Sequence, residues 1–308
     1  MLDRVLVIGS INADHWYEVQ EYAQPSSTVQ AYSHKRCMGG KGVNQARALQ
    51  LAGMDNVRFL GIVGDDDDGR WMTQELKRNN FPTEEILVDE AYRTGHVILQ
   101  KGGKEDPAVL FYLGANNAFT PSVIERAIKD ADVVVVQNEM NGIEDTLRQC
   151  RGKRVLFNPS PIVPDYIPTE LFSVEWLVLN EQELLKLLSI LNISTMSKVC
   201  NADLLKRVKS ITHARNVIVT MSGKGSMAIS EDDEIINVQA VKGNRVVDTV
   251  GAGDCYAGFM MRHLLNGHGL EESMKFAATA ASLKIEGHGA FESIPTLSQV
   301  LDRQLHPS

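Results

Sequence analysis

Short runs of β-branched and aliphatic residues recur along this chain, and most are separated by stretches with the length and pattern of helices. The runs are Val5–Ile8, Val57–Val63, Val133–Val136, Val155–Phe157, Trp176–Leu179 and Val217–Thr220. Strands that alternate with helices predict a parallel sheet, because each helical crossover returns the chain to the same end of the sheet. We therefore expect a doubly wound α/β fold with helices on both faces of a mostly parallel sheet.

Two segments depart from this alternation. Residues 11–37 and 92–113 alternate polar and apolar side chains with no helical stretch inside them, which is typical of strands with one exposed face. We expect them to form a small antiparallel sheet that stands off the main sheet as a lid. A hairpin is expected over residues 226–241, with its turn at the acidic run 231–234. Since no tandem repeat or low-complexity linker interrupts the sequence, residues 1–308 are expected to form one domain.

Composition excludes several classes of function. A net charge of -8 and a pI near 5.5 argue against broad affinity for nucleic acid or for anionic membranes, because both need a basic face. No segment approaches the ~20 apolar residues that span a membrane, and no apolar stretch typical of a secretory signal follows Met1. The four cysteines show no CxxC spacing, so neither a zinc site nor a disulfide framework is expected. A soluble cytoplasmic protein fits these features best.

The most informative segment is residues 247–259, a Gly-rich turn that leads into a helical pattern reaching about Leu265. Small residues at Gly251, Ala252 and Gly253 leave the first N–H groups of that helix free to face a ligand. Such a turn, at the positive end of the helix dipole, can stabilise the charge on a transferring phosphoryl group. Asp254 lies beside it, where a carboxylate can accept the proton of an attacking hydroxyl. The alternative is that Asp254 only caps the helix.

A second Gly-rich segment, residues 38–46, opens another helix that ends before Gly53. It lacks the GxxxxGK[ST] spacing of a Walker loop, and residues 9–11 lack the dinucleotide fingerprint, which makes a nicotinamide oxidoreductase a remote reading. The glycines at positions 39, 40 and 42 predict space for a polyol against the backbone, with Asn44 placed to bind hydroxyls. The alternative is that these glycines only allow close packing.

These two Gly-rich segments, in this order and at roughly this separation, resemble the paired motifs of the ribokinase-like (PfkB) carbohydrate kinases. Similarity to that family extends over nearly the whole chain, through residues 9–15, 114–117, 158–161 and 180–183. The resemblance implies an ATP-dependent kinase that phosphorylates a primary hydroxyl, with D-ribose as the first candidate acceptor. It also implies a lid that closes over the sugar and pairs with a second copy, so that a homodimer is expected.

The resemblance also implies roles for individual residues. Asp254 would be the base, and Gly251, Ala252 and Gly253 would form the anion hole. The sugar hydroxyls would contact residues that follow the first strand, open the second motif or follow the run at 133–136. These are Asn12, Asp14, Gly40, Lys41, Asn44 and Glu139.

For the nucleotide, the resemblance implies contacts from three parts of the chain. The residues are Asn180, Thr220, Ser222, Gly223, Gly225 and Gly253, and Glu183 would act on Mg2+ indirectly. Ser222 stands where the family pattern has a glycine. Asn180 and Glu183 also have the spacing of a helix capping box, and both readings can hold at once. Lys224 could reach a phosphate or be a solvated surface residue.

A potassium ion beside the anion hole is implied by the resemblance alone. Its oxygen ligands would come largely from the backbone at Asp248, Val250, Gly289 and Ser293. The acidic run 65–68 is interpreted as a helix cap in preference to a metal site. His96, in the second lid segment, could face the sugar and alter its choice.

Two other functions stay open. One is a related kinase with another acceptor, such as deoxyribose, a nucleoside or a keto-sugar acid. The other is a catalytically silent sugar-binding regulator, against which the intact Asp254 and its neighbouring glycines count.

Overall fold

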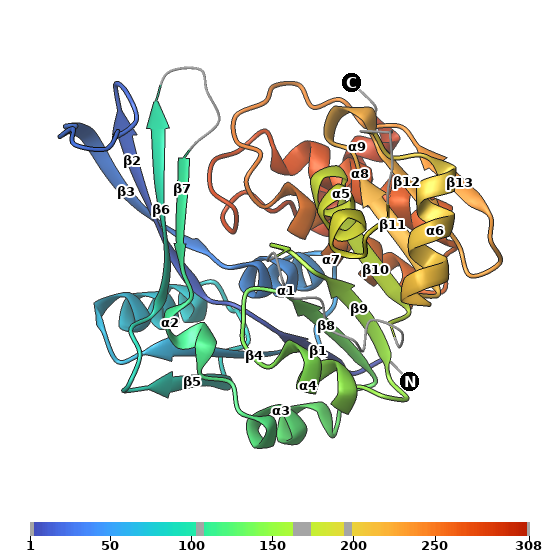
Figure 1. The fold of residues 1–308 in the computed structure, drawn as a ribbon, viewed down its shortest axis with the longest axis horizontal. Helices are drawn as coiled ribbons and strands as arrows, with labels where there is room; N and C mark the ends of the chain where they lie inside the picture. Colours follow the sequence, from blue (N-terminus) through green and yellow to red (C-terminus); the bar gives the residue numbers. More distant parts are fainter. Residues whose placement is uncertain (1–2, 103–107, 163–173, 194–198, 307–308) are drawn as a thin grey trace.

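A large sheet flanked by helices forms the body of the molecule, and a smaller sheet rises from one side of it (Figure 1). This computed structural model describes residues 3–102, 108–162, 174–193 and 199–306. The two parts are the expected α/β body and the expected lid.

The main sheet has nine strands in the order β13-β12-β11-β10-β9-β8-β1-β4-β5. Their bounds are β1 Val5–Ile8, β4 Val57–Gly64, β5 Glu85–Asp89, β8 Val133–Gln137, β9 Arg154–Asn158, β10 Trp176–Asn180, β11 Asn216–Thr220, β12 Ser226–Ile229 and β13 Ile235–Val238. The strands from β11 to β5 run parallel, and β12 and β13 form the expected antiparallel hairpin. All six runs singled out in the sequence are strands.

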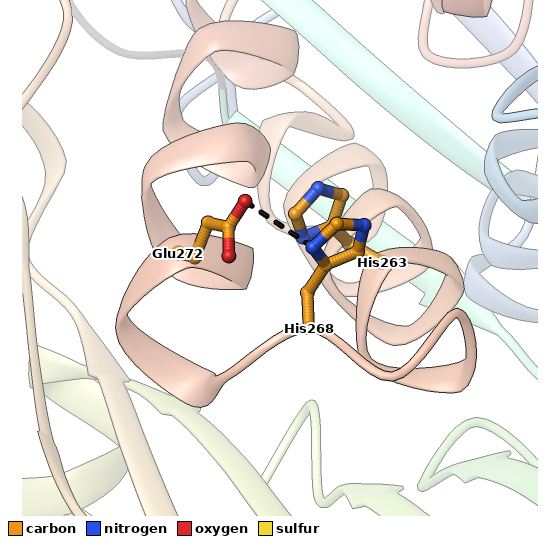
Figure 2. A group of neighbouring side chains, drawn as sticks. All are labelled: His263, His268 and Glu272. Carbon is orange, nitrogen blue, oxygen red and sulfur yellow. Dashed lines mark ion pairs between the residues drawn. The ribbon is translucent and has the colours of Figure 1, made fainter.

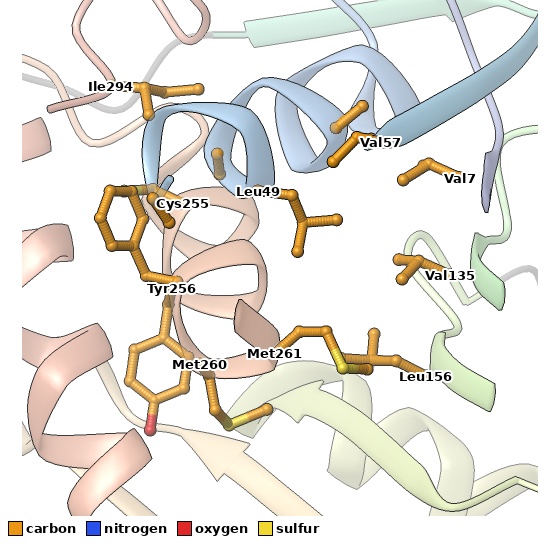
Figure 3. Packing of buried hydrophobic residues seen from close by; sticks show 14 of the residues in the cluster. Val7, Leu49, Val57, Val135, Leu156, Cys255, Tyr256, Met260, Met261 and Ile294 are labelled. Atoms are coloured by element: carbon orange, nitrogen blue, oxygen red, sulfur yellow. The ribbon is translucent and has the colours of Figure 1, made fainter. Parts of the chain in front are cut away.

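Helices cover both faces of this sheet. Their bounds are α1 Lys41–Leu51, α2 Asp67–Arg78, α3 Pro121–Ile128, α4 Ile143–Gln149, α5 Glu181–Ile190, α6 Ala202–Thr212, α7 Ala252–Leu265, α8 Leu270–Lys284 and α9 Leu297–Leu305. Successive side chains of β1 enter opposite cores: Val5 and Val7 pack with α1, α2, α7, α8 and α9, whereas Leu6 and Ile8 pack with α3, α4, α5 and α6. Figure 3 shows the first of these cores where α1 and α7 lie side by side.

The lid is a four-stranded sheet in the order β3-β2-β6-β7. Its strands are β2 Asn12–Val19, β3 Ala31–Gly39, β6 Gly95–Gly102 and β7 Ala108–Tyr112. The expectation of an antiparallel sheet is wrong for one pair, because β2 and β6 run parallel. Each of these two strands leaves the body at the same end, so that they rise in the same direction.

Local signals explain several helix ends. Asp66 caps α2 by accepting the Gly69 amide, as the sequence predicted in preference to a metal site. Short 3₁₀ turns lie after β7, at Gly114–Asn117, and after β11, at Ser222–Lys224.

The four cysteines are buried and free. Among the described helices, none has the length and apolar character needed to cross a bilayer.

Candidate active site

Several of the residues predicted for the site lie at the carboxyl ends of the parallel strands. Glu139 follows β8, Asn180 ends β10 and Thr220 ends β11. Asn12 and Asp14 lie in β2, the first strand of the lid, and not at the end of β1, where the sequence interpretation placed them. An open α/β sheet carries its ligands at this edge, so the topology gathers these groups at one end of the body.

Asp254 lies in the first turn of α7 and is 5% exposed. Both of its carboxylate oxygens accept side-chain amides of α1: Oδ2 accepts Asn44 Nδ2 at 3.1 Å, and Oδ1 accepts Gln45 Nε2 at 3.0 Å. The N-cap of α7 is Gly251, so the alternative that Asp254 caps the helix is wrong. Its side chain is committed to the neighbouring helix, which fixes the orientation of the carboxylate.

Close contact between α1 and α7 makes this arrangement possible. Gly258 lies one turn beyond Asp254, and a Cβ atom there would come within 2.4 Å of the Ala48 Cβ. Any larger residue at position 258 would push the two helices apart. Gly258 therefore brings Asn44 and Gln45 within hydrogen-bond distance of Asp254.

The two glycines before Asp254 do different things. Gly251 has φ +80, a conformation that favours glycine, and a Cβ there would meet the Ala290 Cβ at 2.8 Å. A Cβ at Gly253 would meet nothing within 4 Å. The first turn of α7 therefore opens onto free space at Gly253. The Ala252 amide beside it donates to the Thr249 carbonyl at 3.2 Å.

Acidic side chains surround Lys41 at the start of α1. Desolvation lowers the pKa of its amine, but the carboxylates of Asp254, Glu139, Glu183 and Asp14 outweigh it and raise the pKa overall. Burial raises the pKa of Asp14 well above its usual range, and the nearby Glu139 raises it further. Burial also raises the pKa of Glu139, against the opposing effect of Lys41.

The Glu139 carboxylate links the lid to the body. Its Oε2 accepts the Ser10 hydroxyl at 2.6 Å, the Lys41 amide at 3.2 Å and Asn12 Nδ2 at 3.3 Å. Asn12 Oδ1 in turn accepts Asn116 Nδ2 at 2.8 Å. The structure thus joins Asn12, the Lys41 amide and Glu139, three of the residues predicted to contact the sugar, in one network with Ser10 and Asn116.

Three buried acceptors in this region lack a protein donor in the part of the chain that the structure describes. They are Asp14 Oδ1, Asn44 Oδ1 and Gln137 Oε1. A buried acceptor left without a donor costs about 1–3 kcal/mol. A ligand that carries several hydroxyl groups would supply the missing donors.

The glycines of the second motif serve packing. A Cβ at Gly40 would come within 2.5 Å of the Ser10 carbonyl oxygen, one at Gly42 within 2.6 Å of Gly9, and one at Gly39 within 2.3 Å of the Asp14 carboxylate. The packing alternative is therefore confirmed for Gly40 and Gly42, whereas the Cβ position of Gly39 lies against the carboxylate of Asp14, a predicted sugar contact. Gly40 and Gly42 allow the start of α1 to lie directly against the segment that follows β1.

Asn180 and Glu183 form the capping box of α5. Glu183 donates its amide to Asn180 Oδ1 at 2.8 Å, and Glu183 Oε2 accepts the Asn180 amide at 2.9 Å. The capping reading is confirmed, and it uses one carboxylate oxygen of Glu183. Magnesium keeps most of its waters and needs few protein ligands, so the remaining oxygen is compatible with the indirect role.

The loop after β11 keeps a tight turn despite the departure from the family pattern. Ser222 has φ +51, a conformation that a glycine would adopt at less cost. Gly225 has φ +95, and a Cβ there would come within 2.1 Å of the Val238 carbonyl oxygen. Lys224 pairs with Glu181 at 3.0 Å, in agreement with the surface reading. Thr220 donates to the Leu179 carbonyl at 3.4 Å.

Several of the oxygens expected to bind potassium, those of Asp248 and the Gly289 carbonyl, already accept protein donors. Asp248 Oδ1 accepts the Val250 amide at 3.0 Å, and Asp248 Oδ2 accepts the Gly289 amide at 2.9 Å. The Gly289 carbonyl accepts the Ser293 hydroxyl at 2.5 Å. The Asp248 carbonyl accepts Lys284 Nζ at 3.0 Å. The Asp248 carbonyl is thus paired with a lysine ammonium, so a potassium ion at this carbonyl would meet a positive charge.

His96 does not face the sugar side of the lid. It pairs in register with Ala13 and Tyr112, whereas Asp14 lies one position along β2 and points to the opposite face. Its ring lies 5.0 Å from that of Tyr112. The suggestion that His96 alters sugar choice by facing the pocket is therefore wrong.

Sequence reasoning missed a network of amides behind Asp254. Gln45 Nε2 also donates to Asn158 Oδ1 at 3.1 Å, and Gln45 Oε1 accepts Gln137 Nε2 at 2.7 Å. The sequence did contain a sign of this network, because Gln45 lies among the apolar residues on the buried face of α1. Buried amides in such a place need partners.

A separate cluster of possible metal ligands lies at the far end of α7 from Asp254. Figure 2 shows His263, His268 and Glu272, whose ligand atoms lie within 4.8 Å of one another. The two imidazole rings stack with centroids 3.8 Å apart, and His268 Nδ1 lies 3.2 Å from Glu272 Oε1. These contacts join the end of α7 to α8, and we assign them no part in the chemistry at Asp254.

Comparison with known proteins gives consistent matches. The pattern that describes the pfkB family carbohydrate kinases matches residues 2–297. The ribokinase of Staphylococcus aureus is 29% identical over 314 residues, which cover 97% of this chain and 99% of that protein. A bifunctional ribokinase/ribose-5-phosphate isomerase A of Fructilactobacillus sanfranciscensis is 28% identical over 313 residues, and the match covers 98% of this chain but 56% of that longer protein.

The fold is also similar to solved structures. The Arabidopsis thaliana ribokinase complexed with ribose and ATP matches with a TM-score of 0.85 and 26% identity, covering 98% of each chain. The ribokinase of Cryptococcus neoformans in complex with ADP matches with a TM-score of 0.82 and 27% identity, covering 98% of this chain and 99% of that one.

Proposed function

The chain belongs to the pfkB family of carbohydrate kinases, and on this premise we propose that it transfers the γ-phosphoryl group of ATP to a primary hydroxyl of D-ribose. The relatives named ribokinase support ribose as the acceptor, since they match this chain over nearly its whole length. Ribose 5-phosphate would then be the product.

The observation that carries the proposal is the pair of buried acceptors at Asp14 and Asn44. Asn44 lies in the first turn of α1 with Lys41, and Asp14 is one of several carboxylates that raise the pKa of Lys41. Carboxylate and amide oxygens accept hydroxyl protons, whereas the Lys41 ammonium and the amide nitrogens donate to hydroxyl oxygens. This mixture of acceptors and donors suits a polyol.

Asp254 would act as the base. Its two amide partners hold the carboxylate in one orientation, so that a sugar hydroxyl placed beside it could lose its proton as the oxygen attacks phosphorus. The N–H groups at Gly251, Ala252 and Gly253 would stabilise the charge on the phosphoryl oxygens, because they lie at the positive end of α7. The open space at Gly253 supports this role.

ATP would lie along the loop from Thr220 to Gly225, with its phosphates directed toward the start of α7. Asn180, Ser222, Gly223 and Gly253 complete the proposed contacts. Magnesium, when bound to ATP, would neutralise charge on the phosphates, and Glu183 would hold one of its waters. The proposal includes no potassium ion, because the Lys284 ammonium already lies at the Asp248 carbonyl.

The lid would exclude water from the sugar and limit wasteful hydrolysis of ATP. Its edge strand β7 carries exposed apolar side chains, with Val109 60% and Leu110 65% exposed. Exposed apolar edge strands are commonly covered by another chain. These features support a homodimer formed through the lids.

The test is a coupled assay of ADP release with MgATP and a panel of ribose, deoxyribose, fructose, ketodeoxygluconate and nucleosides. A preference for ribose of tenfold or more in kcat/KM is the expected result. Preference for another acceptor would refute ribose and keep the kinase mechanism. Sugar binding by calorimetry with no turnover on any acceptor would instead favour the silent regulator.

A further inference from the structure

A lysine lies where a metal cation was expected. Lys284, in the last turn of α8, is 0% exposed and donates from Nζ to the Asp248 carbonyl at 3.0 Å. The turn from Asp248 to Gly251 leads directly into α7, whose first N–H groups form the proposed anion hole. The Lys284 ammonium is therefore one hydrogen bond away from the segment that holds this helix start in place.

A fully buried ammonium is costly unless it is paired. Burial has the largest effect on Lys284 and lowers the pKa of its amine overall. The nearby carboxylates of Asp248, Asp254 and Glu292 oppose this effect and favour the charged form. The site thus resembles an internal ion pair, with one cation placed among several oxygens.

The ammonium of lysine and a potassium ion carry the same charge, and both bind carbonyl oxygens. A potassium ion at the Asp248 carbonyl would have to displace Nζ and would meet its positive charge. Each carboxylate oxygen of Asp248 already accepts one amide, from Val250 or from Gly289. A second cation at this position is therefore disfavoured.

We propose that the Lys284 ammonium is a tethered cation that takes the place of a monovalent metal ion beside the anion hole, so that phosphoryl transfer needs no added potassium. This inference rests on the proposed kinase function. Lys284 acts as a positioning residue. It fixes the Asp248 carbonyl, and the Asp248 carboxylate in turn accepts the amides of Val250 and Gly289. Its charge also lies near the start of α7, where negative charge develops during transfer.

The first experiment compares wild-type rates in choline, sodium and potassium chloride at one ionic strength, with MgATP and the best acceptor. We expect kcat/KM to agree within about twofold, since the cation is part of the chain. A rise of tenfold or more in potassium would overturn the inference while leaving the kinase function intact. Absence of turnover in every salt would refute the proposed function instead, and the binding measurement below would then decide the inference.

The second experiment removes the tethered cation. Lys284→Ala should lose at least tenfold in kcat in choline, and ammonium or potassium chloride should restore much of it by entering the vacated space. Lys275→Ala is the matched control, because Lys275 lies on the same helix but is exposed and paired with Glu271. Equal activity of Lys284→Ala and wild type in choline would contradict the inference.

A binding measurement needs no turnover. Thermal unfolding in potassium chloride is compared with that in choline chloride for the wild type and Lys284→Ala. A ligand that binds the folded state raises the melting temperature, so potassium should stabilise the variant and leave the wild type unchanged. Specific stabilisation of the wild type by potassium would refute the inference. If Lys284→Ala does not fold, the wild-type comparisons of rate and of melting temperature between potassium and choline still test the inference.

Discussion

Replacing Asp254 with asparagine tests the proposed base while keeping the volume of the side chain. The new amide oxygen can still accept Gln45 Nε2, but its nitrogen would face the Asn44 nitrogen that now donates to Asp254. Asn44 can rotate its amide by half a turn, because its Oδ1 is buried without a donor. The rotated oxygen would accept the new N–H group. We therefore expect the free energy of unfolding to change by less than about 1 kcal/mol.

The effect on catalysis should be much larger than the effect on stability. Removing a general base lowers a rate by about 10² to 10⁴. This range corresponds to roughly 3–5 kcal/mol of barrier, at about 1.36 kcal/mol for each factor of ten. Because Asp254→Asn keeps the shape of the site, the KM for MgATP should change by less than about threefold. The rotated Asn44 amide would offer the sugar a donor in place of an acceptor, so the sugar KM should rise.

The assay measures kcat and both KM values by ADP release, together with urea unfolding of the same protein. Asp302→Asn is a suitable control, since Asp302 lies exposed on α9. Turnover of Asp254→Asn within tenfold of wild type would refute the assignment of the base. A large loss of kcat with equally large destabilisation would indicate a structural role for the carboxylate.

Further substitutions separate packing from chemistry. Gly253→Ala should leave stability within about 1 kcal/mol, because its Cβ meets open space, yet lower kcat about tenfold by crowding the anion hole. Gly251→Ala should also destabilise the fold by about 1–3 kcal/mol, owing to its positive φ and the contact with Ala290. Asp14→Asn should raise the sugar KM about tenfold or more. Since the folded pKa of Asp14 is raised above the ordinary 3.8, wild-type stability is lost as pH rises through it, and the variant should escape this loss in urea unfolding. Aspartate at both Val109 and Leu110 should yield monomers in sedimentation.

Each of these predictions has a contrary outcome. Equal kcat values for the wild type and Gly253→Ala would show that Gly253 is not part of the anion hole. Parallel pH profiles of stability for the wild type and Asp14→Asn would show that the carboxyl is not desolvated. A dimer that survives the double substitution in the lid, with Leu301→Asp on α9 as the control, would place the interface elsewhere.

The alternation of strands and helices was sufficient to predict the main sheet, because each buried run is short, continuous and apolar. β5 was missed, since Glu85–Asp89 is a half-buried edge strand whose ends are charged. The parallel pairing of β2 with β6 could not be predicted from alternation, which is the same for both directions of pairing. Strand direction depends on where the chain leaves the body.

The candidate site was predicted in part. The turn before Asp254 was visible because glycines and a carboxylate occur together at a helix start. The amides of Gln45 and Gln137 were not predicted, since their roles depend on the contact between α1 and α7. The sequence does indicate that Lys284 is buried, because it follows Ala277 and Ala280 at helical spacing on one face of α8. A charged residue on a buried face needs a partner.

The base of the lid has a consequence for turnover. Asn12 and Gly39 are register partners where β2 and β3 leave the body, and Asp14 lies two residues further along. The residues proposed to hold the sugar are thus the residues about which the lid would swing. Opening the lid must loosen the hold on the sugar, and a stronger hold must restrain opening. Variants at these positions that bind sugar more tightly should therefore release product more slowly, which sets an upper bound on the affinity that a fast enzyme of this design can have.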